Sequence, residues 1–549
     1  MKNMLLTISA LITVLSYGQD INTLTEKANK GNAEAQCKLG VAYDKGEGVA
    51  QSSEKAVYWW RKSAEQGNAL AQYILGNVYY MGKGIAKSYE EAVYWWTKSA
   101  EQGNTDAQNN LGNAYYNGEG VSQSYEQAVY WLTKSAEQGD AEAQHNLGFL
   151  YYKGEGVAQS YKKALFWFQK SAEQGDADAQ YRLGNAYYEG EGVAQSPEKA
   201  VYWLTKSAEQ GNIHAQYVLG VAYLGGTSVA QSYEKAVYWY QKSAEQGHAK
   251  SQVLLGANYY RGEGVAQSYE KAVYWWRKSA NQGDVYAQYH LGNAYDKGEG
   301  VVQSYEKAVY WWRKSAEQDN ADAQYHLGKA YDEGKGVAQS SEKAVYWWTK
   351  SAEQGNTAAQ YHLGKAYDEG KGVAQSSEKA VYWWTKSAEQ GNANAQDFLG
   401  LAYYFGVGVA QSYEKAIYWL RKSAEQGNAR AQVALGTAYY YGQGVPQSYE
   451  QAVYWVRKSA EQGNADAQYL LALAYYKGEG VTQSYEQAVY WVRKSAEQGN
   501  ADAQYLLALA YYKGEGVTQS YEQATYWLGK ACEQGEEEAC RMFNKIKSK

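Results

Sequence analysis

A tryptophan recurs along this chain at intervals of 36 residues, with no insertion or deletion between its copies. The fourteen positions are Trp59, Trp95, Trp131, Trp167, Trp203, Trp239, Trp275, Trp311, Trp347, Trp383, Trp419, Trp455, Trp491 and Trp527. A fixed period of this length is typical of a solenoid, in which each repeat buries its apolar face only against its neighbours. The repeat therefore predicts one elongated domain, whereas the length of 549 residues alone would favour several globular ones.

Each 36-residue block carries the spacing of two helices. Apolar residues three or four apart form one stripe in each half of the second block: Ala71, Leu75 and Tyr79 in the first half, and Ala92, Trp96 and Ala100 in the second. A pair of helices with such stripes cannot bury them alone, so neighbouring pairs must stack. A small residue such as Gly76 then lets the helices approach closely beside the aromatic ridge, and we interpret the repeated tryptophans as structural.

Capping residues predict where both helices begin and end. Asn68 is placed to cap the first helix, and Gly82 follows its last residue, where a left-handed conformation is favoured. Ser88 is placed to cap the second helix, and Glu91 three residues later predicts a capping box. In the fifth block Pro197 directly follows the capping serine, which suits the first position of a helix and not its interior.

The first 18 residues have the three parts of a secretory signal peptide. Lys2 supplies a positive charge, residues 4–15 are mostly apolar, and Gly18 ends a short stretch of small residues before the expected cleavage site. The apolar run is shorter than the roughly 20 residues that a membrane-spanning helix needs. We therefore expect a secreted or periplasmic protein whose mature chain has no stable membrane span.

The repeat register divides the chain into four parts. We predict a signal peptide over residues 1–18, an N-terminal lead-in over residues 19–31, fourteen tandem repeats over residues 32–535, and a C-terminal half-repeat cap over residues 536–549. The net charge is −6, and acidic and basic residues are interspersed, which disfavours a nucleic-acid or anionic-membrane surface.

The blocks resemble a known repeat family. They follow the pattern A-x-x-A-Q-x-x-L-G-x-x-Y-x-x-G-x-G-V-x-x-S-x-x-x-A-x-x-W-x-x-K-(S/A)-A. This pattern is similar to that of the Sel-one-like repeat (SLR) family, relatives of the tetratricopeptide repeat, whose own period is 34 residues. The resemblance implies an all-α fold, an α/α right-handed superhelical solenoid of two-helix repeats. It also implies a non-catalytic adaptor that binds protein or peptide partners along its concave face, without a cofactor or metal.

The resemblance also bears on the two cysteines near the C-terminus. Cysteine-rich secreted SLR proteins resemble the C-x7-C arrangement of Cys532 and Cys540, where it joins two adjacent helices. A disulfide agrees with the expected export, because disulfides persist in oxidising compartments. The alternative is a pair of buried free thiols. Cys37 lies in the first repeat, far from both.

Three consecutive blocks carry a distinct polar segment in their first helices. Its residues are Tyr289, His290, Tyr325, His326, Lys329, Tyr361, His362 and Lys365. Positions that vary among blocks of one chain face solvent or a partner, and in tetratricopeptide-like superhelices the first helix lines the concave face. We predict that these residues bind a protein partner; drift on an unselected surface is the alternative. A shared metal ion is disfavoured, because helices pack about 8–10 Å apart and zinc bonds are about 2 Å long. We interpret the histidine position as a variable surface position.

Two other functions remain open. The spacing S-x-x-K recurs, as in Ser52 and Lys55, and is that of a serine β-lactamase nucleophile. The accompanying S-D-N and K-T-G motifs are missing, and glutamine or glutamate replaces the lysine in several blocks, so we interpret the serine as a helix cap. Carbohydrate or cell-wall binding is the second alternative, through a ladder of tyrosines in the first helices: Tyr80, Tyr116, Tyr152 and Tyr188. The residues do not identify the partner or the oligomeric state.

Overall fold

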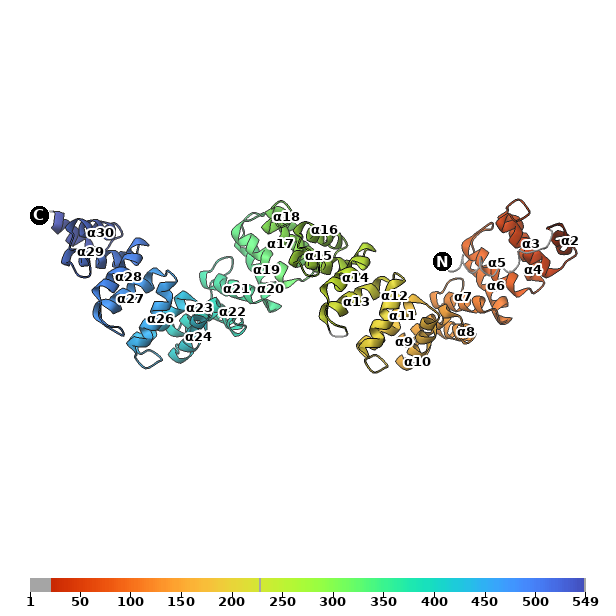
Figure 1. The fold of residues 1–549 in the computed structure, drawn as a ribbon, viewed down its shortest axis with the longest axis horizontal. Helices are drawn as coiled ribbons and strands as arrows, with labels where there is room; N and C mark the ends of the chain where they lie inside the picture. Colours follow the sequence, from red (N-terminus) through yellow and green to blue (C-terminus); the bar gives the residue numbers. More distant parts are fainter. Residues whose placement is uncertain (1–20, 227–228, 548–549) are drawn as a thin grey trace. The chain divides into compact units, whose positions relative to one another are not determined.

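The computed structural model describes residues 21–226 and 229–547, and in these ranges every regular element is a helix. The chain divides into two compact units, Met1–Ser279 and Ala280–Lys549. Each unit is a row of helix pairs stacked against one another (Figure 1). The predicted fold class, an all-α solenoid of 36-residue two-helix repeats, is confirmed. The predicted signal peptide, residues 1–18, lies outside the described residues.

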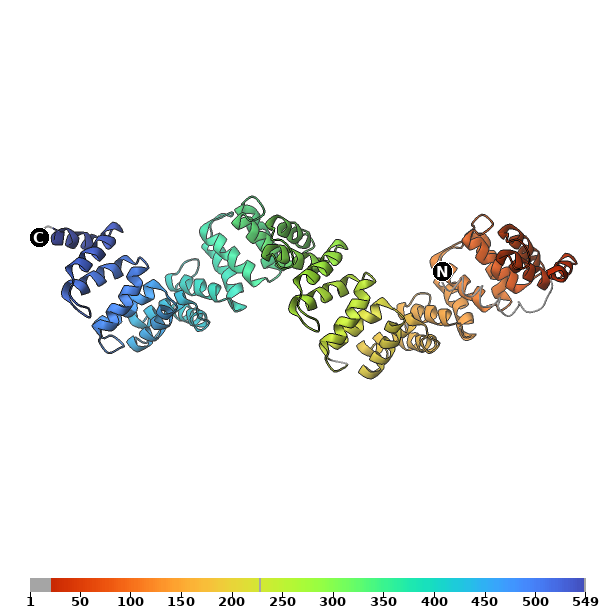
Figure 2. The same ribbon diagram turned by 45° about the horizontal axis from the view of Figure 1, so that its top comes forward.

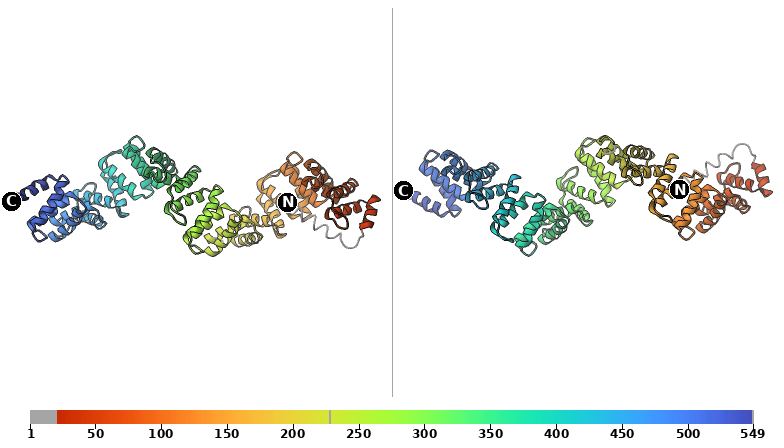
Figure 3. Two further views of the ribbon diagram at one scale, coloured as in Figure 1. Left: turned by 90° about the horizontal axis from the view of Figure 1, so that it is seen from above. Right: turned by 90° about the horizontal axis from the view of Figure 1, so that it is seen from below.

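The first unit contains α2 to α15, and Figure 3 shows its pairs in sequence order. The helices are α2 (Ile21–Asn29), α3 (Ala33–Lys45), α4 (Ser53–Glu65), α5 (Ala69–Met81), α6 (Tyr89–Glu101), α7 (Thr105–Asn117), α8 (Tyr125–Glu137), α9 (Ala141–Lys153), α10 (Tyr161–Glu173), α11 (Ala177–Glu189), α12 (Pro197–Glu209), α13 (Ile213–Gly225), α14 (Tyr233–Glu245) and α15 (Ala249–Arg261). The boundary between the units falls within α16 (Tyr269–Asn281).

The second unit contains α17 to α31 (Figure 2). The helices are α17 (Val285–Lys297), α18 (Tyr305–Ala316), α19 (Ala321–Glu333), α20 (Ser341–Glu353), α21 (Thr357–Glu369), α22 (Ser377–Glu389), α23 (Ala393–Phe405), α24 (Tyr413–Glu425), α25 (Ala429–Tyr441), α26 (Tyr449–Glu461), α27 (Ala465–Lys477), α28 (Tyr485–Glu497), α29 (Ala501–Lys513), α30 (Tyr521–Glu533) and α31 (Glu537–Lys547). From α3 onward, odd-numbered helices are the first helices of repeats and even-numbered helices are the second.

The helix caps predicted for the second block are confirmed, but the capping box predicted there is wrong. The side chain of Asn68 accepts a hydrogen bond from the Ala71 amide, and Gly82 has a φ of 70°. Ser88 Oγ accepts from the Glu91 amide at 3.2 Å. The Ser88 amide, which Glu91 would bind in a capping box, instead donates to the carbonyl oxygen of Tyr79 at 3.0 Å. Because the Ser88 amide already bonds to the preceding helix of the same repeat, it is not available to Glu91, whose side chain is exposed.

Close packing of the two helices depends on the glycine in the middle of each first helix. A Cβ at Gly328 would lie 2.5 Å from Cδ1 of Trp348 and 3.1 Å from the carbonyl oxygen of Ala344. The indole of Trp348 is 4% exposed, so it cannot move toward solvent without losing its packing. The predicted close approach beside the aromatic ridge is therefore confirmed.

A buried polar ladder links the two helices of each repeat and joins the repeat to its neighbour. Gln360 Nε2 donates to the carbonyl oxygen of Ala352 at 3.1 Å, and Gln360 Oε1 accepts from Gln390 Nε2 at 2.8 Å. Ser351 Oγ donates to the carbonyl oxygen of Ala321 at 2.6 Å. These bonds recur at intervals of 36 residues, and they satisfy buried groups that would otherwise be unpaired. The glutamine is a fixed letter of the repeat pattern and the serine shares its position there with alanine, but sequence reasoning assigned neither a hydrogen-bonding role.

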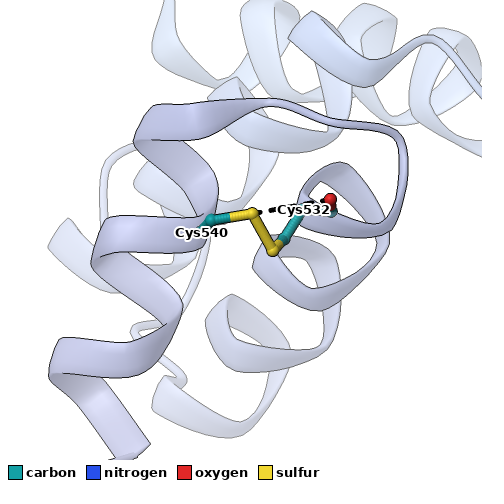
Figure 4. Close-up of a disulfide and its surroundings, with 2 residues drawn as sticks. All are labelled: Cys532 and Cys540. Carbon is teal, nitrogen blue, oxygen red and sulfur yellow. Dashed lines mark hydrogen bonds between the residues drawn. A yellow bond between two sulfur atoms is a disulfide. The ribbon is translucent and has the colours of Figure 1, made fainter.

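Both ends of the solenoid are half repeats. The N-terminal lead-in contains α2, whose Leu24 and Ala28 are buried against α3. Gln36 Nε2 donates to the carbonyl oxygen of Ala28 at 3.0 Å, the bond that other repeats make to a second helix. Helix α2 thus makes for α3 the contact that a second helix makes for the first helix of the following repeat. At the other end, a disulfide between Cys532 and Cys540 joins α30 to α31 (Figure 4).

Asp319 is the one non-glycine residue with positive φ among the described residues. Its φ is 63°, whereas Gly283 and Gly355 at the equivalent turn have φ of 96° and 94°. Helix α18 also ends one residue earlier than the other second helices. A left-handed conformation costs a residue with a Cβ about 1–2 kcal/mol, so this joint is strained.

Candidate functional site

The predicted partner-binding residues lie on three successive first helices of the second unit. Tyr289 and His290 belong to α17, Tyr325, His326 and Lys329 to α19, and Tyr361, His362 and Lys365 to α21. The equal spacing of the repeats places equivalent residues on equivalent turns. The structure therefore brings the set together as a ladder across neighbouring repeats, and no residue of the set is isolated from the others.

The histidines of this ladder are packed and not on the open surface as we interpreted them. The His326 ring stacks on Trp312 with centroids 5.0 Å apart and an interplanar angle of 20°. The His362 ring stacks on Trp348 at 5.1 Å and 25°. Each histidine is half-buried against a tryptophan of the preceding second helix. The reason is that the tryptophan ring fills the groove between two first helices, and the variable position closes the far side of that groove.

Tyr289 and Tyr325 each contact the histidine of the next repeat, and Tyr361 contacts Phe398 there. The ring centroids of Tyr289 and His326 are 5.8 Å apart, and those of Tyr325 and His362 are 5.7 Å apart. Both tyrosines are half-buried, and burial raises the pKa of their hydroxyl groups. Tyrosine and histidine therefore form a continuous row of aromatic contacts, the aromatic stack, that joins neighbouring repeats.

The lysines are the exposed part of the predicted set. Lys329 and Lys365 have 47% and 46% of their side chains exposed. Lys329 Nζ lies 3.7 Å from Glu333, and Lys365 Nζ lies 3.5 Å from Glu369, each one helical turn further along the same helix. Such exposed pairs add little to stability, so these charges remain available to a partner.

The aromatic stack ends in an ion pair that sequence reasoning missed. Phe398 stacks on Trp384 at 4.9 Å, and the guanidinium of Arg430 lies 4.0 Å above the Phe398 ring. Arg430 Nε also donates to Asp397 Oδ2 at 2.5 Å, and Asp397 is 1% exposed. Burial raises the pKa of Asp397 while Arg430 opposes that rise. The signal in the sequence is an aspartate where the two preceding blocks have Tyr325 and Tyr361.

Burial makes the two stacked histidines a source of pH dependence. It lowers the pKa of His326 and of His362 from the ordinary value of 6.5; Asp296 and Asp322 raise the pKa of His326, and Lys329 lowers it further. Above pH 6.5 the rings are neutral in folded and unfolded chains, and stability is complete. As the pH falls through 6.5 toward the lower folded pKa, the unfolded chain binds more protons and stability is lost.

We expect the double variant His326→Phe, His362→Phe to lose less stability than the parent protein between pH 7 and pH 5. Phenylalanine is the matched replacement, because Phe398 makes the same stack in the following repeat. The measurement is the denaturation midpoint at several pH values. Parallel curves for the two proteins would show that the stacked rings do not titrate on unfolding.

The tyrosine ladder proposed for carbohydrate binding is partly occupied by internal contacts. Tyr80 packs on Tyr89 with centroids 5.2 Å apart and on Trp96 at 5.5 Å. Tyr152 Oη donates to Glu191 of the next repeat at 3.3 Å. A different aromatic row is more exposed, one residue per second helix: Tyr58, Tyr94, Tyr130, Phe166, Tyr202, Tyr238 and Tyr274 in the first unit, and Tyr310, Tyr346, Tyr382, Tyr418, Tyr454, Tyr490 and Tyr526 in the second. Sequence reasoning missed this row because each residue directly precedes the marker tryptophan.

The serine and lysine of the S-x-x-K spacing have separate partners. Ser52 Oγ accepts a hydrogen bond from the backbone amide of Lys55 at 3.3 Å, which makes it a helix cap as predicted. The Lys55 amine lies 5.3 Å from the ring centroid of Tyr43, in a cation–π contact. The same lysine–tyrosine contact recurs in both units, for example between Lys343 and Tyr331. In these repeats the lysine amine therefore caps a tyrosine ring.

Two further features are absent from the described ranges. In residues 21–226 and 229–547, no group of three histidine, cysteine, aspartate or glutamate side chains could hold a metal ion. In the same ranges, no helix is both long enough and apolar enough to cross a membrane.

Comparison with known proteins agrees with the repeat register. The Sel1 repeat family matches fourteen consecutive stretches: residues 33–68, 69–104, 105–140, 141–176, 177–212, 213–248, 249–284, 285–320, 321–356, 357–392, 393–428, 429–464, 465–500 and 501–536. No curated protein matches the chain. Among solved structures, the chain is similar to c5321, a protective antigen present in uropathogenic Escherichia coli strains that displays an SLR fold. The identity is 37% over 88% of this chain and 97% of that one, with a TM-score of 0.56.

A second solved structure is similar over a shorter range. It is a Sel1 repeat protein from Oxalobacter formigenes, 33% identical over 59% of this chain and 93% of that one, with a TM-score of 0.46. The family matches cover the chain from residue 33 to residue 536 without a gap. The chain belongs to the Sel1 repeat family.

Proposed function

We propose that this protein is a non-catalytic, exported scaffold that binds a protein or peptide partner along its first helices, with α17, α19 and α21 as the contact. Sel1 repeat proteins are generally scaffolds for protein interaction. The observation that carries the proposal is that packed and exposed side chains have separate roles in this segment. The aromatic stack holds the three helices in register, and the lysines beside it stay exposed.

The proposed export rests on two features. The disulfide between Cys532 and Cys540 supports it, because such bonds persist in oxidising compartments. The similarity to a protein described as a protective antigen is in line with it. The composition of residues 1–18 predicts how the chain would leave the cytoplasm.

The test is an affinity capture with residues 19–549 as bait. Proteins retained from an envelope extract are identified by mass spectrometry, purified and rebound to the bait one at a time. The variant Lys329→Ala, Lys365→Ala removes exposed charge without touching the aromatic stack. The matched control, Lys350→Ala, Lys386→Ala, removes the same charge from the second helices of the same two repeats.

A purified partner that binds the parent and the control, and binds the first-helix variant at least about tenfold more weakly, supports the proposal. Equal binding to both variants would contradict the placement of the contact. Retention of glycan and of no protein would favour the carbohydrate alternative.

A further inference from the structure

The second unit contains a pocket of about 200 Å³ between α25, α26 and α27. Its wall includes Gly436, Thr437 and Tyr440 from α25, and Val456 from α26. Leu470 and Ala474 close it from α27, and the exposed side chains of Tyr441 and Lys477 lie at its mouth. The pocket is mostly apolar and open to solvent at one end.

The pocket coincides with a short side chain, Val456, on α26. Val456 stands where six other repeats have a tryptophan: Trp60, Trp96, Trp276, Trp312, Trp348 and Trp384. In each of these repeats the indole fills the space between the first helix of its own repeat and the first helix of the next. Valine is too short to reach across, so in this repeat the space is left as a pocket.

The second repeat shows what belongs in the space. There the Trp96 ring lies against Gly76, 5.5 Å from the Tyr80 ring, and its Nε1 donates to Asn77 Oδ1 at 2.9 Å. Gly76, Asn77 and Tyr80 correspond to Gly436, Thr437 and Tyr440, ten repeats later. The pocket therefore lies in the place of the indole, and Thr437 offers a hydroxyl oxygen where Asn77 offers an amide oxygen.

The far wall agrees with this assignment. Leu470 occupies the position of His326 and Phe398, which stack on the tryptophans of their preceding repeats. Ala474 is partly exposed, whereas its equivalents Ala330 and Ala366, which follow tryptophan-bearing helices, are buried. The missing ring has thus uncovered the wall that it covers elsewhere.

We propose that this pocket binds an aromatic side chain of a partner protein, with the indole of tryptophan as its best fit; this rests on the proposed function as a protein-binding scaffold. An apolar cavity of this order binds a single aromatic ring, since it offers dispersion contacts that water does not replace. The mouth is polar: Lys477 Nζ lies 3.8 Å from Glu479, and Tyr440 Oη donates to Glu479 at 2.9 Å. Such a rim suits the backbone of a peptide that inserts one ring.

The test uses small probes, so it does not require the partner. N-acetyl-tryptophanamide and N-acetyl-leucinamide are titrated into the full chain by calorimetry, and hydrogen exchange of α25 to α27 locates the site. Val456→Trp fills the pocket with the residue that other repeats use. Val456→Leu fills it partly, as Leu132, Leu204 and Leu420 do in their repeats, and guards against misfolding of the larger replacement. Val302→Ala, at a loop residue that is 90% exposed, is the neutral control.

We expect the tryptophan probe to bind the parent and the control with a dissociation constant on the order of 1 mM or below. Binding should be at least about tenfold tighter than that of the leucine probe, weaker in Val456→Leu, and lost in Val456→Trp. Equal binding of the two probes, equal binding to the folded variants, or no binding to the parent up to about 10 mM would overturn the proposal. The lysine variants lie in other repeats, so the two tests are independent. A negative result with the tryptophan probe would not contradict the proposed contact on α17, α19 and α21. A negative result with the lysine variants would not contradict the proposed pocket.

Discussion

The substitution Trp348→Ala is expected to lower the free energy of unfolding of the second unit by about 3–5 kcal/mol, the range found when large buried aromatic residues are truncated. The indole is 4% exposed, lies against Gly328 and carries the His362 ring. Its loss removes contacts on both sides of the groove, and the glycine cannot move in to replace them. The neighbouring repeats would be affected as well, because a solenoid is stabilised by the interfaces between repeats.

The measurement is denaturant unfolding followed by circular dichroism, with hydrogen exchange to locate the loss in α19 to α21. Tyr346→Ala is the control: Tyr346 lies on the same helix and is 52% exposed, so its truncation should cost far less. A loss below about 1 kcal/mol for Trp348→Ala would mean that the groove closes on itself, and that a tryptophan at this position is not structural.

Removing the C-terminal disulfide, by the double substitution Cys532→Ser, Cys540→Ser, is expected to destabilise α31 by about 2.5 kcal/mol. This value follows from the entropy of closing a loop of about 8 residues. Helix α31 makes most of its helix contacts with α30, so the effect should be local. Of its residues only Ala539 is fully buried, while Met542, Phe543 and Ile546 are partly buried against the same core, so the covalent link adds to a modest apolar contact.

Hydrogen exchange of α31 should become roughly 50–100-fold faster in the variant, the rate equivalent of that free energy. Exchange in α17 to α23 should not change and provides the internal control. Unchanged exchange in α31 would show that the half repeat is held by its packing alone. Faster exchange throughout the second unit would show instead that the cap controls the stability of its whole row of repeats.

Sequence reasoning predicted the architecture well because the residues that define the repeat act on nearby backbone. The interval of 36 residues, the asparagine and serine caps and the glycines after the first helices act within one or two turns of the chain. Since each repeat contacts only its neighbours, fourteen copies of the same helix pair determine the fold. The strain at Asp319 was predictable for the same reason, because the conformation belongs to that turn alone.

The errors occurred where a partner from a different helix decides the outcome. The Ser88 amide bonds to the carbonyl of Tyr79, and so a capping box that the spacing favours does not form. Sequence reasoning assigned the lead-in no helix, yet α2 folds because α3 offers it an apolar surface. His326 varies among the blocks like a surface residue, but the indole of Trp312 covers one of its faces.

The same distinction between local signals and contacts across helices applies to the candidate sites. The sequence by itself determined the repeat, its register and the residues that differ from block to block. Only the tertiary structure decided that the lysines at 329 and 365 are exposed while the histidines beside them are packed, and that Val456 leaves a pocket open. The physical reason is that exposure and cavity volume depend on side chains that meet across helices. A periodic sequence states which residue stands at each position, and the packing determines whether its neighbours fill the space around it.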